Sequence, residues 1–159
     1  MLHPKNSLMP KLHSLYPRNE KGKKCQNRLQ TLGKLIQELN KKTIPEETTG
    51  FINKKIDEIN EFSGSEKALS KHLLKVLSSI LKEIEKKLKL VPKNHYRHTW
   101  MAIGMAAFGI PTGVAFASAM GNMAFIGIGL PIGMLIGMSV GTGLDKKAFE
   151  KGNQLNIDI

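Results

Sequence analysis

Residues 98–144 form a continuous stretch of 47 residues without one Asp, Glu, Lys or Arg. A membrane-spanning helix needs roughly 20 apolar residues, whereas a straight helix of about 46 residues would extend roughly 70 Å, more than twice the roughly 30 Å hydrocarbon core. The strongly polar break at Met120-Gly121-Asn122 lies near the middle and contains common turn formers. We therefore expect a transmembrane hairpin over 93–146, with helices at about 99–119 and 123–144.

A buried helical hairpin inside a soluble protein is the alternative to a membrane hairpin. Both helices would then have to be covered on all sides by the remainder of the chain. The remaining residues are too polar and too few to do so. The composition therefore favours the membrane hairpin.

A short phrase occurs twice within the uncharged stretch, because Gly109-Ile110-Pro111-Thr112-Gly113 corresponds to Gly129-Leu130-Pro131-Ile132-Gly133. Helices in lipid associate through close backbone approach, which small residues allow, and a four-residue spacing keeps such residues on one side. The predicted helix-packing residues are Gly109, Gly113, Ala117 and Gly121 in the first helix, and Gly129, Gly133, Gly137 and Gly141 in the second. Ala102 and Ala106 extend the first set toward the N-terminus.

Two further features of the repeats concern helix shape and association. Pro111 and Pro131 occupy equivalent positions and are expected to kink the two helices.

The second helix carries additional glycines at Gly127 and Gly143. We therefore hypothesise that the protein forms homo-oligomers, or contacts other membrane helices, through its glycine stripes.

The charges predict an orientation. Before Thr99 the chain has 21 Lys and Arg against 10 Asp and Glu, and after Leu144 it has 3 of each, so the whole net charge of +11 precedes the hairpin. The turn is uncharged, and basic residues flank both helices at their other ends. By the positive-inside rule both termini are expected in the cytoplasm. The predicted membrane-interface residues are Tyr96, Arg97, Trp100, Lys146 and Lys147.

The part of the chain before the hairpin is expected to be helical. Residues 1–24, with three prolines and no apolar period, predict a flexible basic arm. Residues 25–92 contain three amphipathic segments, over about 25–42, from about 45, and from about 66 to 90. They could form a small bundle or an oligomeric stalk, or the third could lie on an anionic leaflet. Residues 147–159 are expected to be a cytoplasmic tail.

No catalytic, cofactor-binding or metal-binding constellation is evident, so we expect no enzyme and no cofactor. The single cysteine, Cys25, excludes an intrachain disulfide, and His95 and His98 have no carboxylate or thiol beside them in the sequence. Lysines next to a membrane helix are explained by topology, so we do not expect nucleic-acid binding.

Residues 93–154 resemble the small glycine-zipper membrane proteins of bacteria. The residues that carry the resemblance are Tyr96, the two Gly-x-Pro-x-Gly repeats, Asn122, the segment Leu144-Asp145-Lys146-Lys147-Ala148, Glu150 and Gly152. The resemblance implies a bacterial two-span membrane protein, and it assigns no activity to any residue. Together with the helical spacing before the hairpin, we expect an all-α protein of the bacterial cytoplasmic membrane.

Three functional classes are compatible with these features. The first is a self-associating membrane protein that presents a basic helical module to a cytoplasmic partner, as an interaction or scaffold protein. The second is a small pore-forming or membrane-perturbing effector. The third is an accessory subunit of a larger membrane complex. We favour the first.

Overall fold

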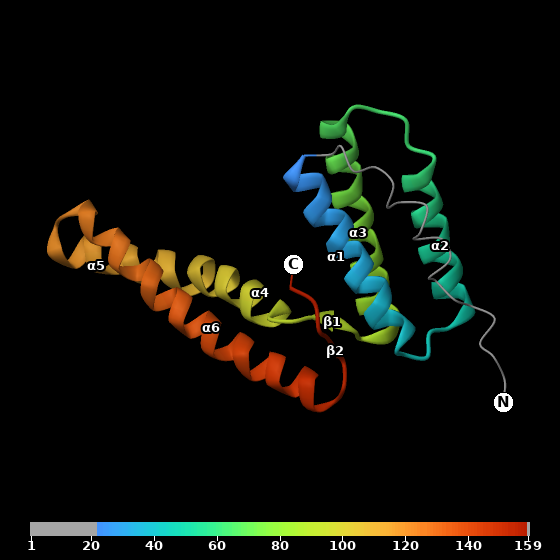
Figure 1. The fold of residues 1–159 in the computed structure, drawn as a ribbon. Coiled ribbons are helices and arrows are strands. Elements are labelled where there is room, and N and C mark those ends of the chain that lie inside the picture. The colour runs from blue at the N-terminus through green and yellow to red at the C-terminus, as the bar shows by residue number, and fades with distance from the viewer. Residues whose placement is uncertain (1–21, 159) are drawn as a thin grey trace. The chain divides into compact units, whose positions relative to one another are not determined.

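The computed structural model describes residues 22–158, and the arm predicted for residues 1–24 lies almost wholly outside them. The chain divides into two compact units, which are Met1–Val91 with Leu155–Ile159, and Pro92–Gln154. Within the described residues both units are helical, apart from one two-stranded sheet. Figure 1 shows the elements in chain order.

Three helices build the first unit: α1 (Lys23–Asn40), α2 (Glu46–Asn60) and α3 (Glu66–Leu88). The side chain of Ser65 accepts a hydrogen bond from the N–H of Ala68 and so caps α3. Helix α2 begins directly after Pro45 without a side-chain cap.

The apolar stripes of these helices face one another, and α3 packs against both α1 and α2. Leu32, Leu35 and Ile36 of α1, Ile52 and Ile56 of α2, and Leu73, Ile80 and Ile84 of α3 are fully buried together in one core. Within the chain these three helices therefore form a bundle, one of the arrangements expected for residues 25–92.

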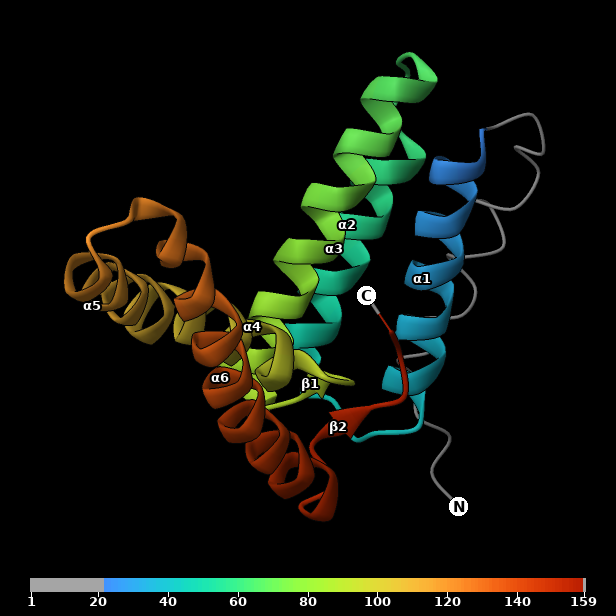
Figure 2. The ribbon, with the colours of Figure 1, turned by 90° about the vertical axis from the view of Figure 1, so that its left-hand side faces the viewer.

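Two antiparallel arms build the second unit, and they lie side by side in both views (Figures 1 and 2). The first arm consists of α4 (His95–Gly104), a π-helical segment (Met105–Gly109) and α5 (Ile110–Met120). The second arm begins with a 3-10 turn (Met123–Phe125) and continues as α6 (Ile126–Glu150). Both arms extend further from the turn than the predicted limits of 99 and 144.

The turn lies at Gly121 and Asn122, where the sequence predicts it. Gly121 has a φ of 65°, which favours glycine, and ends α5. The side chain of Asn122 accepts a hydrogen bond from the N–H of Ala124 at 2.9 Å and so begins the second arm. Length and composition allow His95–Met120 and Met123–Glu150 to cross a membrane.

Beyond the hairpin the chain returns to the first unit. Strand β2 (Gln154–Leu155) pairs with β1 (Val91–Pro92), which precedes the hairpin. Leu155 and Ile157 are 0% and 2% exposed and belong to the core of the helical bundle. Asn156 donates its N–H to the Glu38 carboxylate, whose pKa is lowered chiefly by its hydrogen bond with Lys41 and further by the one from Asn156. The end of the predicted tail is thus part of the core.

Replacement of Leu155 by Ala is expected to loosen the helical bundle, although the residue lies far from α1 in sequence. Removing a fully buried leucine side chain costs about 2–5 kcal/mol, and the change should appear as faster amide hydrogen exchange in α1 and α3 of the full chain in detergent. Asn156→Ala is the matched control, because the Asn156 side chain is exposed and its backbone hydrogen bond is retained. Equal exchange in both variants would contradict the role of the tail in the core.

Candidate functional site: the contact between the hairpin helices

Four glycines of α6 lie directly against the backbone of the first arm. A Cβ atom added to Gly129, Gly133 or Gly137 would lie less than 3.0 Å from backbone atoms of that arm, a separation that real Cβ atoms essentially never show. A Cβ on Gly141 would lie 2.5 Å from the Arg97 Cα. The glycines at four-residue spacing in α6 therefore form a line of backbone contact with the first arm of the same chain.

The first arm contributes Gly104, Gly109 and Gly113 to this contact. A Cβ on Gly104 would meet the backbone of Gly133 and Gly137, and one on Gly109 would lie 3.1 Å from the Gly129 carbonyl oxygen. Ala117 is 3% exposed. Gly104 is absent from the predicted set, while Ala102 and Ala106, which the four-residue pattern predicts, are exposed.

The π-helical segment at Met105–Gly109 explains this change of register. A π-helical turn contains about one residue more than an α-helical turn, so the buried position before Gly109 falls five residues earlier, at Gly104. The proline ring of Pro111 would clash with the carbonyl four residues before it, at Ala107, and Ala107 lies in the widened segment. A five-residue offset between Gly104 and Gly109 is the signal that could have indicated it.

The two prolines therefore occupy different settings despite their equivalent sequence positions. Pro111 is in the first turn of α5, directly after the π-helical segment, whereas Pro131 lies inside the continuous helix α6.

Gly121 does not have the packing role predicted for it. It occupies the turn, and a Cβ added to it would have nothing within 4 Å. Its role is conformational.

Asp145 closes the end of the hairpin away from the turn. Its carboxylate accepts the N–H of Tyr96 at 3.1 Å and the N–H of Arg97 at 2.9 Å, and the residue is 7% exposed. Asn94, which precedes α4, makes no side-chain cap. A carboxylate at a helix N-terminus satisfies free N–H groups and interacts favourably with the helix dipole. Asp145 on α6 thus caps α4.

Asp145 directly follows the uncharged stretch, and the sequence pattern alone does not predict that its carboxylate caps α4. A signal exists, because Asp145 lies four residues beyond Gly141 and therefore continues the same side of α6. Recognising it requires the helix register, which places the first turn of α4 opposite.

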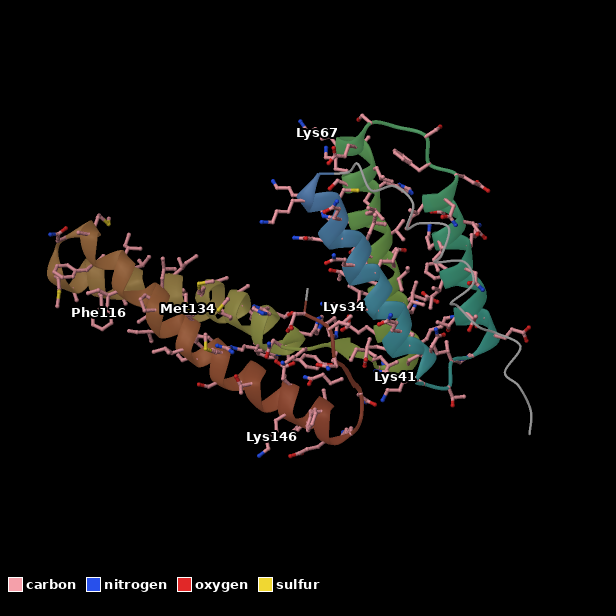
Figure 3. All side chains as sticks on the ribbon, viewed as in Figure 1. Lys34, Lys41, Lys67, Phe116, Met134 and Lys146 are labelled. Atoms are coloured by element: carbon pink, nitrogen blue, oxygen red, sulfur yellow. The ribbon has the colours of Figure 1, made fainter. Side chains whose placement is uncertain are left out.

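The predicted membrane-interface residues lie at the same end of the hairpin as Asp145. Tyr96 and Arg97 are in the first turn of α4, and the Arg97 guanidinium is 3.4 Å from the Met138 sulfur. Trp100 is half-buried, and its carbonyl faces Gly137. Lys146, labelled in Figure 3, is exposed and lies 4.0 Å from Glu150. Lys147 is exposed in the last turn of α6, where its charge favours the helix C-terminus.

The outer surface of the hairpin is apolar. Its exposed large side chains are Ile103, Phe108, Ile110, Val114, Phe116, Met120, Met123, Ile128, Leu130, Ile132, Leu135, Ile136, Val140 and Phe149. Figure 3 labels Phe116 on α5 and Met134 on α6. In the most apolar 18-residue part of each arm, only 22% of the first arm and 17% of the second arm is buried. A core hairpin of a soluble protein would instead be covered.

Three hydroxyl groups on this unit are satisfied by their own helices. Thr99 donates to the His95 carbonyl at 2.9 Å, Ser139 to the Leu135 carbonyl at 2.9 Å, and Thr142 to the Met138 carbonyl at 2.8 Å. Such bonds keep polar side chains paired where no water is available.

Comparison of the chain with protein-family models, curated proteins and solved structures found no match. Among residues 22–158, no group of three His, Cys, Asp or Glu side chains is placed to hold a metal ion.

Replacing Gly137 by Ala is expected to force the two arms apart, since the added methyl would meet the Trp100 and Met101 backbone, which cannot rotate away. Overpacking of this kind costs about 1–3 kcal/mol, so the thermal unfolding midpoint in detergent should fall. Gly143→Ala is the matched control in the same helix, because nothing lies within 4 Å of its added Cβ. It should be neutral or slightly stabilising through better helix propensity. A Gly137→Ala protein as stable as the control would contradict the backbone contact.

Replacing Asp145 by Ala is expected to expose the amides of Tyr96 and Arg97 to exchange. Loss of the acceptor costs about 1–3 kcal/mol for fully buried donors and less for these part-buried ones. Amide hydrogen exchange of the first turn of α4 should therefore accelerate, while exchange near the turn at Gly121 changes little. Glu150→Ala is the control, because it removes an equal charge from an exposed position of the same helix. Unchanged exchange at Tyr96 and Arg97 in the Asp145 variant would rule out the cap.

Proposed function

We propose that this chain is an integral membrane protein whose hairpin anchors the helical bundle at the cytoplasmic face of the membrane, where the bundle meets a partner. The observation that carries the proposal is the hairpin itself, whose outer surface is apolar while its glycine backbone is turned inward. In water such an exposed apolar surface would favour aggregation. In a bilayer the same surface contacts the lipid chains, while the polar backbone is satisfied within the hairpin.

Pairing of β1 with β2 supports the orientation. These strands directly flank the hairpin, so its two ends lie on one side of any membrane that it crosses. The excess of 21 Lys and Arg over 10 Asp and Glu before Thr99 supports a cytoplasmic location for that side. The resemblance to bacterial glycine-zipper proteins makes the bacterial cytoplasmic membrane our proposed location.

The structure changes the surface available for self-association. Gly129, Gly133, Gly137 and Gly141 face the other arm of the same chain, so the stripe expected to join copies is already occupied. We therefore assign contacts between copies, or with helices of a larger complex, to the outer apolar surface. A pore would require several hairpins to surround a path, since backbone fills the space within one hairpin.

Cysteine labelling in intact cells tests the membrane hairpin. In a Cys25→Ala background, Met123→Cys at the turn should react with a membrane-impermeant maleimide added outside, because Met123 is 77% exposed there. Lys151→Cys, beyond the other end of α6, is the matched probe and should react only after lysis. The protein should also stay in the membrane fraction after alkaline carbonate extraction.

Release by carbonate would overturn the anchor, and equal labelling of both probes from outside would overturn the proposed orientation. The mass of the same protein after mild detergent extraction separates the functional classes. A multiple of 17.6 kDa supports self-association, and co-extracted foreign subunits support the accessory role. Collapse of the membrane potential on expression would instead favour the pore former.

A further inference from the structure

Five exposed lysines lie along one side of α3, and we call them the lysine face: Lys67, Lys71, Lys75, Lys82 and Lys86. At 3.6 residues per turn they fall within an arc of about 100° and extend over about 28 Å of helix. Figure 3 labels Lys67 at the beginning of this helix. The apolar side of α3 is buried in the core, so the lysine face is a free surface of the bundle.

The charges of this face are not neutralised within the described part of the chain. Lys41, Lys55 and Lys87 of the bundle pair with carboxylates, but none of the five lysines lies within 4.0 Å of one. Glu85 lies on the same side of α3, near the C-terminal end of the lysine face, and is half-buried. Unpaired like charges at this spacing repel one another, which costs free energy unless a negative partner binds.

An apolar side chain interrupts the lysine face. Leu74 is 50% exposed, and among the large exposed hydrophobic residues of the described chain it is the one outside the hairpin. Its neighbours on the face are lysines and Ser78. Lysines around an exposed leucine match an anionic membrane surface, where ammonium groups meet headgroup phosphates and a leucine enters the acyl boundary.

We propose that the lysine face of α3 binds the anionic phospholipid headgroups of the leaflet at which the hairpin begins. Only residues 89–94 separate α3 from α4, a connection that spans at most about 20 Å. If the hairpin is inserted, the face is confined near headgroups and their effective concentration is high. The inference therefore rests on the membrane anchor proposed above.

Nucleic acid is the other polyanion that a row of lysines could meet. Single strands are held by aromatic side chains on which bases stack, and the lysine face carries none. The proposed membrane anchor would keep the lysine face close to lipid headgroups, but it would not keep the face close to nucleic acid. The observations therefore favour lipid, and nucleic-acid binding becomes an outcome of the test.

The test uses the full chain in liposomes, with an environment-sensitive fluorophore on Leu74→Cys in a Cys25→Ala background. Vesicles of phosphatidylcholine alone are compared with vesicles containing 30% phosphatidylglycerol. In the anionic vesicles the emission should shift to the blue and brominated lipid should quench it. Salt at 1 M should reverse both effects, since the Debye length then falls to about 3 Å.

Charge reversal identifies the surface. Lys71→Glu, Lys75→Glu and Lys82→Glu together should abolish the response to phosphatidylglycerol. Reversal of Lys24, Lys34 and Lys54, three exposed lysines of α1 and α2, changes the net charge equally and should reduce the response no more than about twofold. Flotation of every variant with the vesicles after carbonate treatment shows that the hairpin is inserted.

The outcomes separate the two proposals. A protein that fails to float overturns the membrane anchor, and with it the premise of this inference. An inserted protein whose fluorophore does not respond to phosphatidylglycerol overturns the lipid site alone, as does an equal loss in both triple variants. Displacement of the response by an oligonucleotide at physiological salt would assign the lysine face to nucleic acid.

Discussion

The close approach of the two hairpin arms at their glycines fixes the rest of the second unit. Because hydrogen atoms replace side chains at this contact, the backbones touch and the register of α6 against the first arm is determined. That register places Asp145 opposite the first turn of α4, where two free N–H groups need an acceptor. It also returns the chain beside its point of departure, which allows β2 to pair with β1.

The two units place their polar groups in opposite ways. The bundle buries leucine and isoleucine and exposes lysine, as a domain in water does. The hairpin exposes leucine, isoleucine and phenylalanine and turns its backbone inward, while Thr99, Ser139 and Thr142 satisfy their hydroxyls locally. The two units thus differ in the surface that they expose. The core of the bundle also contains Leu155, a residue that follows the hairpin in the chain.

Much of the architecture could be predicted from the sequence. The length of the uncharged stretch requires two helices, Gly121 and Asn122 supply the turn, and the apolar spacing in residues 25–90 predicts three amphipathic helices. The glycine spacing in α6 identifies the residues that contact the first arm. The matching side of that arm is only partly predictable. The π-helical segment shifts the helix register, so that Gly104 rather than Ala106 lies at the contact.

The sequence alone determines composition along the chain: where apolar length, small residues and positive charge occur, and hence which segments suit lipid and which suit water. Only the tertiary structure decides which small residue meets which backbone, that Asp145 caps a helix 48 residues earlier at Arg97, and that Ile157 fills a core begun by α1. Local spacing specifies one helix at a time. These contacts depend on the register between segments, which is settled when surfaces from distant parts of the chain pack together.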